Sequence, residues 1–206
     1  MPEHGRHGPS IARVFGQLGV AQRRKTAQPI ETFIVALAMT AHTRIVAKFV
    51  GVDEALITRY IESNFEGVDV VVGSLEAGSP EIAWGDTFFI YDPNRDLSDT
   101  RRFPFATIVT KDYGEFDNAS KLDRPGVFRL NIGVSKETYA TLFDAEDQFD
   151  FTALDRLLPH PVYGSNHFVC VLNPSDSTFE TIKPLLAEAY QIAVKRAAPR
   201  TPPSVR

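Results

Sequence analysis

The chain has 206 residues, of which 43% are hydrophobic and 23% are charged, the usual mixture of one globular domain with some additional chain. No stretch approaches the ~18 consecutive apolar residues of a membrane-spanning helix, so we expect no membrane partner. The single cysteine, Cys170, excludes an internal disulfide and a cysteine-rich metal cluster. The net charge of −4 divides into +5 for residues 1–52, −13 for residues 53–194 and +4 for residues 195–206. An acidic domain repels phosphates, which disfavours nucleic-acid binding except through the basic ends.

Residues 1–51 are rich in Gly, Arg, His and Gln and show no sustained periodicity, which predicts a poorly ordered basic extension. The apolar run at residues 33–38 has some features of a secretory signal, but it is short and follows Glu31 closely. We therefore expect a soluble, cytoplasmic protein. We interpret the extension as a segment upstream of the true start of the protein. In this interpretation, synthesis starts at Met39 or Val52.

A single α+β domain is predicted over residues 52–197, and it begins with a helix. Asp53 is a good N-cap, apolar residues follow it at helical spacing, and Gly67 is typical of a helix end. Short apolar and β-branched runs then predict strands at Val68–Val72, Glu81–Trp84, Thr87–Tyr91 and Phe105–Thr110. The Trp84–Thr87 junction is typical of a hairpin turn.

The segment Val127–Val134 is the most informative predicted strand. Its hydrophobic side chains share one face: Phe128, Leu130, Ile132 and Val134. Its other face carries Arg129, Asn131 and Gly133. One face therefore faces the core and the other presents polar groups, and a short helix from Ser135 to Phe143 follows.

Two further segments complete the predicted sheet region. Residues Thr152–Leu158 are expected to form a short helical turn that Pro159 stops. Residues Phe168–Leu172 are apolar on both faces, as in a central strand covered on both sides. Cys170 lies within this strand, so we expect a buried and unreactive thiol.

The last predicted helix begins with a capping box formed by Ser177 and Glu180. Pro184 predicts a kink or a delayed start, and the prolines of residues 198–206 predict a disordered tail. The order of elements predicts an α+β fold, with a largely antiparallel sheet and the N-terminal and C-terminal helices packed on one face.

Three segments carry a family resemblance: LDRPGVFRLNIGVS (residues 122–135), LLPHPVYG (157–164) and VCVLNPS (169–175). They resemble the signature of a bacterial family known only as a domain of unknown function, which implies no activity. More distantly, Phe65–Val68 and the strand and helix that follow His167 resemble the MmcQ/YjbR-like proteins. That resemblance implies a double-wing fold related to frataxin and DNA binding in some members, which the −13 charge of the core opposes.

The polar face of the 127–134 strand is the first candidate site. An arginine on a sheet holds a carboxylate or phosphate through two parallel hydrogen bonds, and a neighbouring amide fixes its orientation. Arg129 and Asn131 are such a pair. The alternative is that Arg129 forms an internal ion pair with an acidic residue such as Asp86, Asp123 or Asp155.

The second candidate is the proline-stiffened loop around His160. Pro159 and Pro161 flank the histidine, so its imidazole and the phenol of Tyr163 are held before any ligand arrives, which lowers the entropic cost of binding. A histidine here is a general-base or metal-ligand candidate. The alternative is a packed loop that anchors the last strand.

No motif predicts a metal or a cofactor. A metal held by His160 and His167 with Asp155 or Asp86 matches no known ligand spacing. The chain also lacks a Gly-x-Ser-x-Gly nucleophile elbow and a phosphate-binding glycine loop.

These observations lead to one preferred function and two alternatives. In the preferred one, Arg129, Asn131, His160 and Tyr163 form the ligand site of a non-catalytic module that binds a small molecule or a protein. The first alternative is an enzyme in which His160 or His167 is the general base and Arg129 binds an anionic substrate. The second is nucleic-acid binding through the basic ends.

Overall fold

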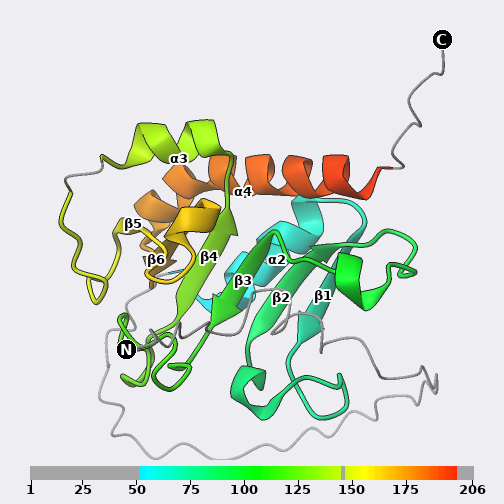
Figure 1. Cartoon of the computed structure of the whole chain (residues 1–206), viewed down its shortest axis with the longest axis horizontal. Helices are drawn as coiled ribbons and strands as arrows, with labels where there is room; N and C mark the ends of the chain where they lie inside the picture. The colour runs from blue at the N-terminus through cyan, green and yellow to red at the C-terminus, as the bar shows by residue number, and fades with distance from the viewer. Residues whose placement is uncertain (1–51, 145–146, 199–206) are drawn as a thin grey trace, which may run out of the picture.

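The computed structural model describes residues 52–144 and 147–198, which contain one six-stranded sheet (Figure 1). The strands are β1 (Val68–Val72), β2 (Thr87–Tyr91), β3 (Ala106–Val109), β4 (Arg129–Gly133), β5 (Leu157–Pro159) and β6 (Phe168–Leu172). Their order in the sheet is β1-β2-β3-β4-β6-β5, and every neighbouring pair is antiparallel. The predicted α+β class is therefore confirmed. The predicted extension at residues 1–51 and nearly all of the predicted tail at 198–206 lie outside the described residues.

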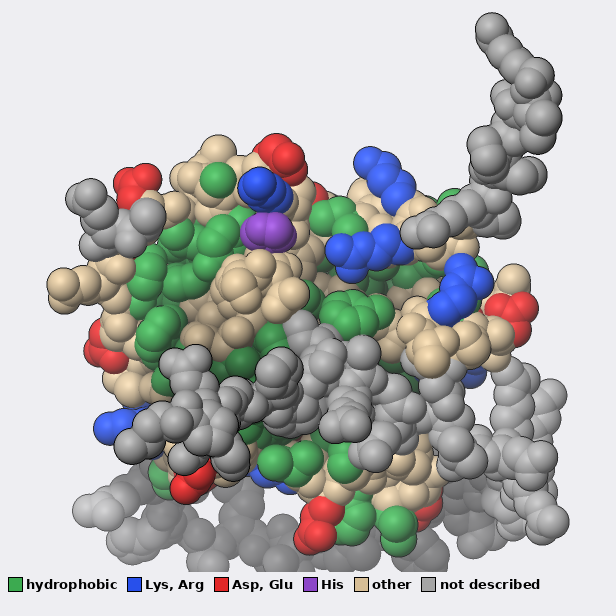
Figure 2. Space-filling view, viewed as in Figure 1, with side chains coloured by type: hydrophobic (Ala, Val, Ile, Leu, Met, Phe, Trp, Pro, Cys, Tyr) green, Lys and Arg blue, Asp and Glu red, His purple; other side chains and the backbone are tan. Residues whose placement is uncertain are grey.

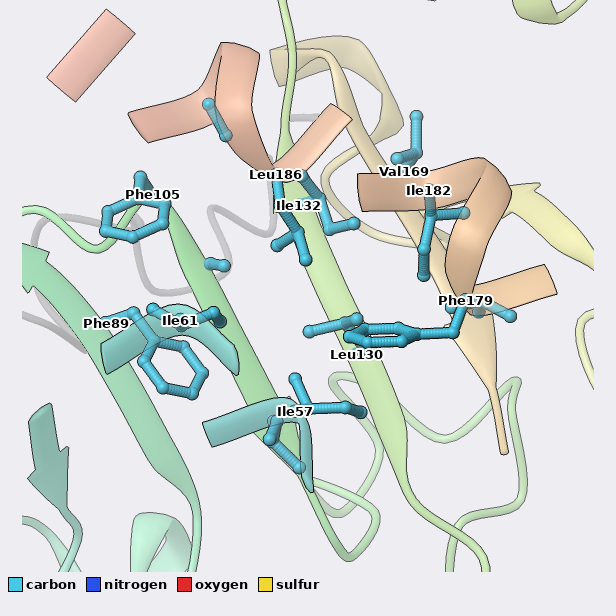
Figure 3. Close-up of a cluster of buried hydrophobic side chains, with 14 of the residues drawn as sticks. Ile57, Ile61, Phe89, Phe105, Leu130, Ile132, Val169, Phe179, Ile182 and Leu186 are labelled. Carbon is cyan, nitrogen blue, oxygen red and sulfur yellow. The ribbon is translucent and has the colours of Figure 1, made fainter. Parts of the chain in front are cut away.

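Within the described residues, three α-helices accompany the sheet: α2 (Glu54–Asn64), α3 (Lys136–Leu142) and α4 (Asp176–Ala197). The apolar faces of α2 and α4 pack on the same face of the sheet, and Figure 3 shows their side chains meeting those of β2, β4 and β6. The core includes Ile57 and Ile61 of α2, Phe179, Ile182 and Leu186 of α4, and Phe89, Leu130, Ile132 and Val169 of the strands. Burial of this apolar surface is the main contribution to folding.

The helix starts follow the capping rule, with one change from the prediction. Asp53 caps α2 as predicted, because its carboxylate accepts a hydrogen bond from the backbone N–H of Leu56. The N-cap of α4 is Ser175, whose hydroxyl accepts from Thr178 N–H, so the predicted capping box at Ser177 is wrong. The helix begins at once and continues through Pro184, which excludes the predicted delayed start.

The segment between β1 and β2 also differs from the prediction. Residues Glu81–Ala83 form a 3-10 turn rather than a strand, and Val72 pairs directly with Thr87. The loop folds back on itself, because Gly73 N–H donates to the carbonyl oxygen of Asp86 and Gly85 N–H donates to the carbonyl oxygen of Gly73. A Cβ atom at Gly73 would lie 1.9 Å from the carbonyl oxygen of Ala83, so only glycine fits this close approach.

The predicted helical turn at Thr152–Leu158 is wrong. Leu157–Pro159 instead forms the edge strand β5, which pairs with Val169–Val171 of β6. Proline is compatible with an edge strand because no neighbour on its outer side needs its missing N–H. The short apolar run is ambiguous in sequence, and only the adjacent strand makes it extended.

The second face of the sheet is covered by loops rather than helices. Register places Thr107 of β3, Asn131 of β4 and Cys170 of β6 beside one another on this face. Residues 110–128 and 160–167 lie over them, with Asp117, Ser120 and His160 reaching Arg129 of β4. The face that the strand pattern predicts to be polar is therefore buried, and Arg129 is 1% exposed.

Candidate functional site

A guanidinium that donates four hydrogen bonds to three side chains is the centre of the buried polar cluster. Arg129 Nε donates to Asn131 Oδ1 at 2.9 Å. Its Nη1 donates to Ser120 Oγ at 2.8 Å and to Asp117 Oδ1 at 3.1 Å. Its Nη2 donates to Asp117 Oδ2 at 2.5 Å and lies 3.2 Å from His160 Nε2. A guanidinium has five N–H groups, so acceptors of the protein take up four of them and the fifth faces His160.

The partner of Arg129 is a carboxylate that the sequence pattern did not single out. Asp117 lies in the loop between β3 and β4 and forms a two-point ion pair with the guanidinium. The ion-pair alternative is thus realised, but none of the three acidic residues suggested for it is the partner. Because the pair is internal, Arg129 is not open to a ligand anion.

The three suggested carboxylates have other roles. Asp86 accepts hydrogen bonds from Thr110 and from the phenol of Tyr113, and its burial raises the pKa of its carboxyl group. Asp123 accepts from a backbone N–H within the β3–β4 loop. Asp155 accepts from Ser175 N–H at the start of α4, and that hydrogen bond lowers its pKa. All three stabilise loops or helix ends.

His160 is held by its own loop through the other ring nitrogen. The backbone N–H groups of Val162 and Tyr163 both donate to His160 Nδ1, each at 3.1 Å. The backbone N–H of His160 donates to Phe168 of β6, which ties the loop to the sheet. Burial, together with the nearby charge of Arg129, keeps the pKa of His160 well below its usual 6.5. The ring is therefore neutral at neutral pH.

This arrangement determines where the proton of the neutral ring lies. Since Nδ1 accepts two hydrogen bonds, the proton is on Nε2. That N–H then faces Nη2 of Arg129, which is itself a donor, at 3.2 Å. The closest carboxylate oxygen of Asp117 is 3.9 Å from Nε2, beyond hydrogen-bond distance. Two buried donors therefore face each other without an acceptor between them.

A small cavity of about 30 Å³ lies over this point, and we call it the Arg129–His160 pocket. Its walls are mainly aromatic, from Phe88, Tyr113, Phe116, Tyr163 and Phe168. Its polar lining is Thr107, Asp117, Arg129, Asn131 and His160. It has room for a few water molecules at most, so a larger occupant has to move part of the wall.

The remaining predicted residues occupy distinct places around this pocket. Asn131 is fixed on both sides, because its amide nitrogen donates to Thr107 Oγ1 at 2.9 Å while its oxygen accepts from Arg129. The ring of Tyr163 lies tilted against the ring of His160, with 4.9 Å between ring centres, and burial raises the pKa of its phenol to about 12. Cys170 is buried, as predicted, and burial raises the pKa of its thiol to about 12.

His167 is the one predicted site residue that the structure leaves out of the pocket. Its backbone takes a left-handed conformation, with φ of +63°, where it ends the turn Gly164–Asn166. Its ring packs against Tyr139 of α3, with 5.6 Å between ring centres. The structure thus brings together Arg129, Asn131, His160 and Tyr163 but not His167.

The sequence interpretation missed the residues of the β3–β4 loop. Asp117, Ser120, Tyr113 and Phe116 cover or line the pocket, yet they lie in a polar segment without strand or helix periodicity. One signal was available: a strand arginine on a buried face requires a carboxylate nearby. With 26 acidic residues in the chain, that requirement does not identify the partner.

Two classes of feature are absent from residues 52–144 and 147–198. No three side chains of histidine, cysteine, aspartate or glutamate come together there in a way that could hold a metal ion. None of the helices in this part combines the length and the hydropathy that crossing a bilayer requires.

Comparison with known proteins gives one match. Residues 52–202 match a family described as a family of unknown function, DUF6194. No curated protein and no solved structure matches the chain.

Proposed function

We propose that this chain, which belongs to the DUF6194 family of unknown function, binds a small uncharged molecule in its Arg129–His160 pocket and does not catalyse a reaction on it. In this proposal the ligand presents a hydrogen-bond acceptor, such as a carbonyl oxygen, to His160 and Arg129. Its apolar body packs among the aromatic walls. Pockets of this kind, mostly apolar with a few converging polar groups, are typical ligand sites.

The observation that carries the proposal is the pair of opposed donors. Nε2 of His160 and Nη2 of Arg129 lie 3.2 Å apart, and Asp117 Oδ2, which accepts from Nη2, is 3.9 Å from Nε2, too far to accept from it as well. A buried donor without an acceptor loses free energy, about 1–3 kcal/mol. An acceptor atom placed in the pocket would satisfy both groups at once.

The charge of the pocket supports an uncharged ligand. Asp117 balances the positive charge of Arg129 through two hydrogen bonds, so the lining carries no net charge. An anion would have to displace Asp117 or be buried beside it, and burying an unpaired charge is costly. The anionic ligand of the enzyme alternative is therefore disfavoured.

The state of His160 also argues against general-base catalysis. A general base needs an unoccupied lone pair directed at the substrate and a pKa near the working pH. The lone pair of Nδ1 is engaged by Val162 and Tyr163, while Nε2 carries the ring proton. The lowered pKa makes the ring a weak base.

Because the pocket is small, a ligand has to move part of its lining, and we expect it to enter through the aromatic wall. Phe116 and Tyr163 contact each other with 6.1 Å between ring centres, and each belongs to a loop rather than to the sheet. Rotation of these two rings would enlarge the cavity of about 30 Å³ without disturbing a strand. Side-chain rotation on a loop is a low-cost change compared with strand separation.

The finer predictions from the sequence accompany this proposal. They are a single domain at residues 52–197, an MmcQ/YjbR-like relationship and a cytoplasmic location. A chain limited to residues 52–198 that unfolds in one cooperative transition would support the first of them. Removing both basic ends would also abolish any nucleic-acid binding, in line with the charge of the core.

The test follows the His160 ring directly. The full chain is labelled with ¹⁵N-histidine, and the ring signal is assigned by its loss in His160→Gln and its retention in His167→Gln. Three probes of similar size are titrated: acetophenone, with an acceptor and no charge; ethylbenzene, with neither; and benzoate, with a charge. We expect the free ring to show its proton on Nε2, and acetophenone to shift that nitrogen far more than the other probes do.

Three results would reject the proposal. The first is a ring proton on Nδ1, which removes the opposed donors. The second is a stronger response to benzoate than to acetophenone, which would favour an anion site. The third is no shift at His160 with any probe up to its solubility limit.

A further inference from the structure

A second cavity lies at the end of the sheet, beside the C-terminal turns of α4, and we call it the α4 groove. The loop before β3 forms one side, Ala193 and Arg196 of α4 form another, and Gly133 and Phe168 lie at the ends of β4 and β6. Its volume is about 80 Å³, more than twice that of the Arg129–His160 pocket. The α4 groove is therefore the roomier of these two sites.

The charge of the α4 groove is opposite to that of the domain around it. Two arginines, Arg101 and Arg196, line the groove, and none of its described lining residues carries a carboxylate. Residues 53–194 have a net charge of −13. Figure 2 shows Lys and Arg side chains gathered near the C-terminal end of α4, with hydrophobic side chains between them. A positive spot on an acidic surface is a place where an anion is attracted locally.

The two guanidiniums have donors available. Arg101 Nη2 donates to the carbonyl oxygen of Ala197 at 3.2 Å, which holds the side chain at the end of α4. Its other N–H groups have no partner among the described residues, and neither does any N–H of the Arg196 side chain. Both side chains are exposed. A guanidinium that is tethered but not saturated is suited to binding a carboxylate.

The rest of the lining is mainly apolar and aromatic. Tyr91, Phe103, Phe105 and Phe168 contribute rings, and those of Phe103 and Phe168 lie 6.5 Å apart in an edge-on arrangement. Ring faces and edges of this kind favour a flat aromatic body over a compact inorganic ion. The groove therefore combines an anion-binding rim with an aromatic floor.

We propose that the α4 groove binds a small aromatic carboxylic acid, with its carboxylate at Arg101 and Arg196 and its ring on the aromatic floor. This site is separate from the one under Proposed function, and its electrostatic preference is the reverse. The rings determine the shape of the ligand, and the guanidiniums determine its charge.

The experiment is isothermal titration calorimetry of the full chain at low ionic strength with two flat probes of the same size. Naphthalene-2-carboxylate is charged, and naphthalene-2-carboxamide is its neutral counterpart. We expect the carboxylate to bind at least about fivefold more tightly than the carboxamide, because two exposed ion pairs form and each contributes up to ~1 kcal/mol. Arg101→Gln and Arg196→Gln should each weaken carboxylate binding about three- to fivefold and leave carboxamide binding unchanged.

Matched variants keep this test specific. Arg59→Gln removes the same charge from an exposed position on α2 and should leave both affinities unchanged. Arg196→Lys should restore part of the carboxylate affinity that Arg196→Gln loses. Inorganic phosphate is the control for a site that recognises charge alone, and it should not compete with naphthalene-2-carboxylate.

Several outcomes would overturn the proposal. Equal affinity for the two naphthalene probes would show that charge plays no part. A loss of affinity in Arg59→Gln as large as in Arg196→Gln would show attraction by net charge and not by the groove. Effective competition by phosphate would show that the aromatic floor does not contribute.

Discussion

The two cavities place the same side chain in opposite situations. Arg129 is 1% exposed, with Asp117, Ser120 and Asn131 taking its hydrogen bonds. Arg101 and Arg196 are exposed at the rim of the α4 groove. None of the described residues that line this groove carries a carboxylate. An arginine can thus act as a structural ion-pair member in one place and as a ligand-binding group in another. Partner and burial decide between the two roles, and residue type does not.

The difference also separates the kinds of ligand that the two cavities favour. The Arg129–His160 pocket has a balanced charge and an unsatisfied donor pair, so it favours a neutral acceptor. The α4 groove has two unbalanced guanidiniums, so it favours an anion. Phe168 lines both cavities, which makes it the structural link between them. Each prediction below tests one part of this contrast.

The largest expected effect comes from removing the buried guanidinium. Arg129→Met leaves the Asp117 carboxylate buried without its cation, and we expect the free energy of unfolding to fall by about 3–5 kcal/mol. Arg196→Met removes an exposed guanidinium and should change it by less than about 0.5 kcal/mol. Urea unfolding followed by tryptophan fluorescence at Trp84 measures both.

A double variant checks this reasoning if Arg129→Met does not fold. Arg129→Met with Asp117→Leu removes both charges, so it should recover much of the lost stability. Equal stability of Arg129→Met and Arg196→Met would contradict the contrast between a buried and an exposed arginine.

The second effect is a pH dependence that belongs to the buried histidine. His160 has a folded-state pKa well below 6.5, so below about pH 6.5 only the unfolded chain takes up a proton there. The free energy of unfolding is therefore unaffected by this group above that pH. It should fall as the pH is lowered, by up to about 1.4 kcal/mol per pH unit.

His160→Gln supplies the control for this pH dependence. The variant should lose the slope between about pH 6.5 and 5.5, which urea unfolding at several pH values measures. Asp86 works in the opposite direction, because a raised carboxyl pKa increases stability as the pH falls towards its own range. Measurements are therefore kept above about pH 5.5, where carboxyl groups contribute least. An unchanged slope in the variant would mean that His160 titrates normally.

The third effect tests the link between the two cavities. A Cβ atom at Gly133 would lie 3.0 Å from the ring of Phe168, so Gly133→Ala must push that ring aside. We expect a loss of about 1 kcal/mol in unfolding free energy, together with changed affinity for both acetophenone and naphthalene-2-carboxylate. A second substitution, Phe168→Leu, should reduce the loss because its side chain is smaller. Independent, additive effects of the two substitutions would show that the contact does not matter.

The smallest effect is a difference in salt dependence. Raising sodium chloride from about 0.05 M to about 0.5 M should weaken naphthalene-2-carboxylate binding roughly threefold, because ions screen exposed charges. Acetophenone binding at His160 should be unchanged, since the guanidinium and carboxylate there are already paired. Calorimetry and the NMR titration give the two values. If salt weakened the binding of both probes equally, the predicted electrostatic difference between the two cavities would be wrong.

Much of the fold follows from short-range pattern. Alternation along residues 127–134 predicts β4 and assigns Arg129 and Asn131 to the face opposite the core. Helical spacing and an N-cap likewise predict α2 after Asp53. Such patterns depend on residues only a few positions apart, so they can be read before the chain folds.

The errors have a common origin in contacts between distant segments. Leu157–Pro159 becomes a strand only because β6 lies beside it, and nothing within the tripeptide requires this. Asp117 is twelve residues from Arg129, and His160 is thirty-one residues from it. Their meeting depends on how two loops without periodicity cross the second face of the sheet.

Local pattern was therefore enough for the α+β class, the main strands and the face on which the polar residues of β4 stand. Three-dimensional packing decided the rest: that this face is covered, that Asp117 occupies the guanidinium, and that Arg101 and Arg196 meet at one groove. The physical reason is that periodicity reflects the geometry of a single element. Burial and ion pairing arise only between elements, once the whole sheet has formed.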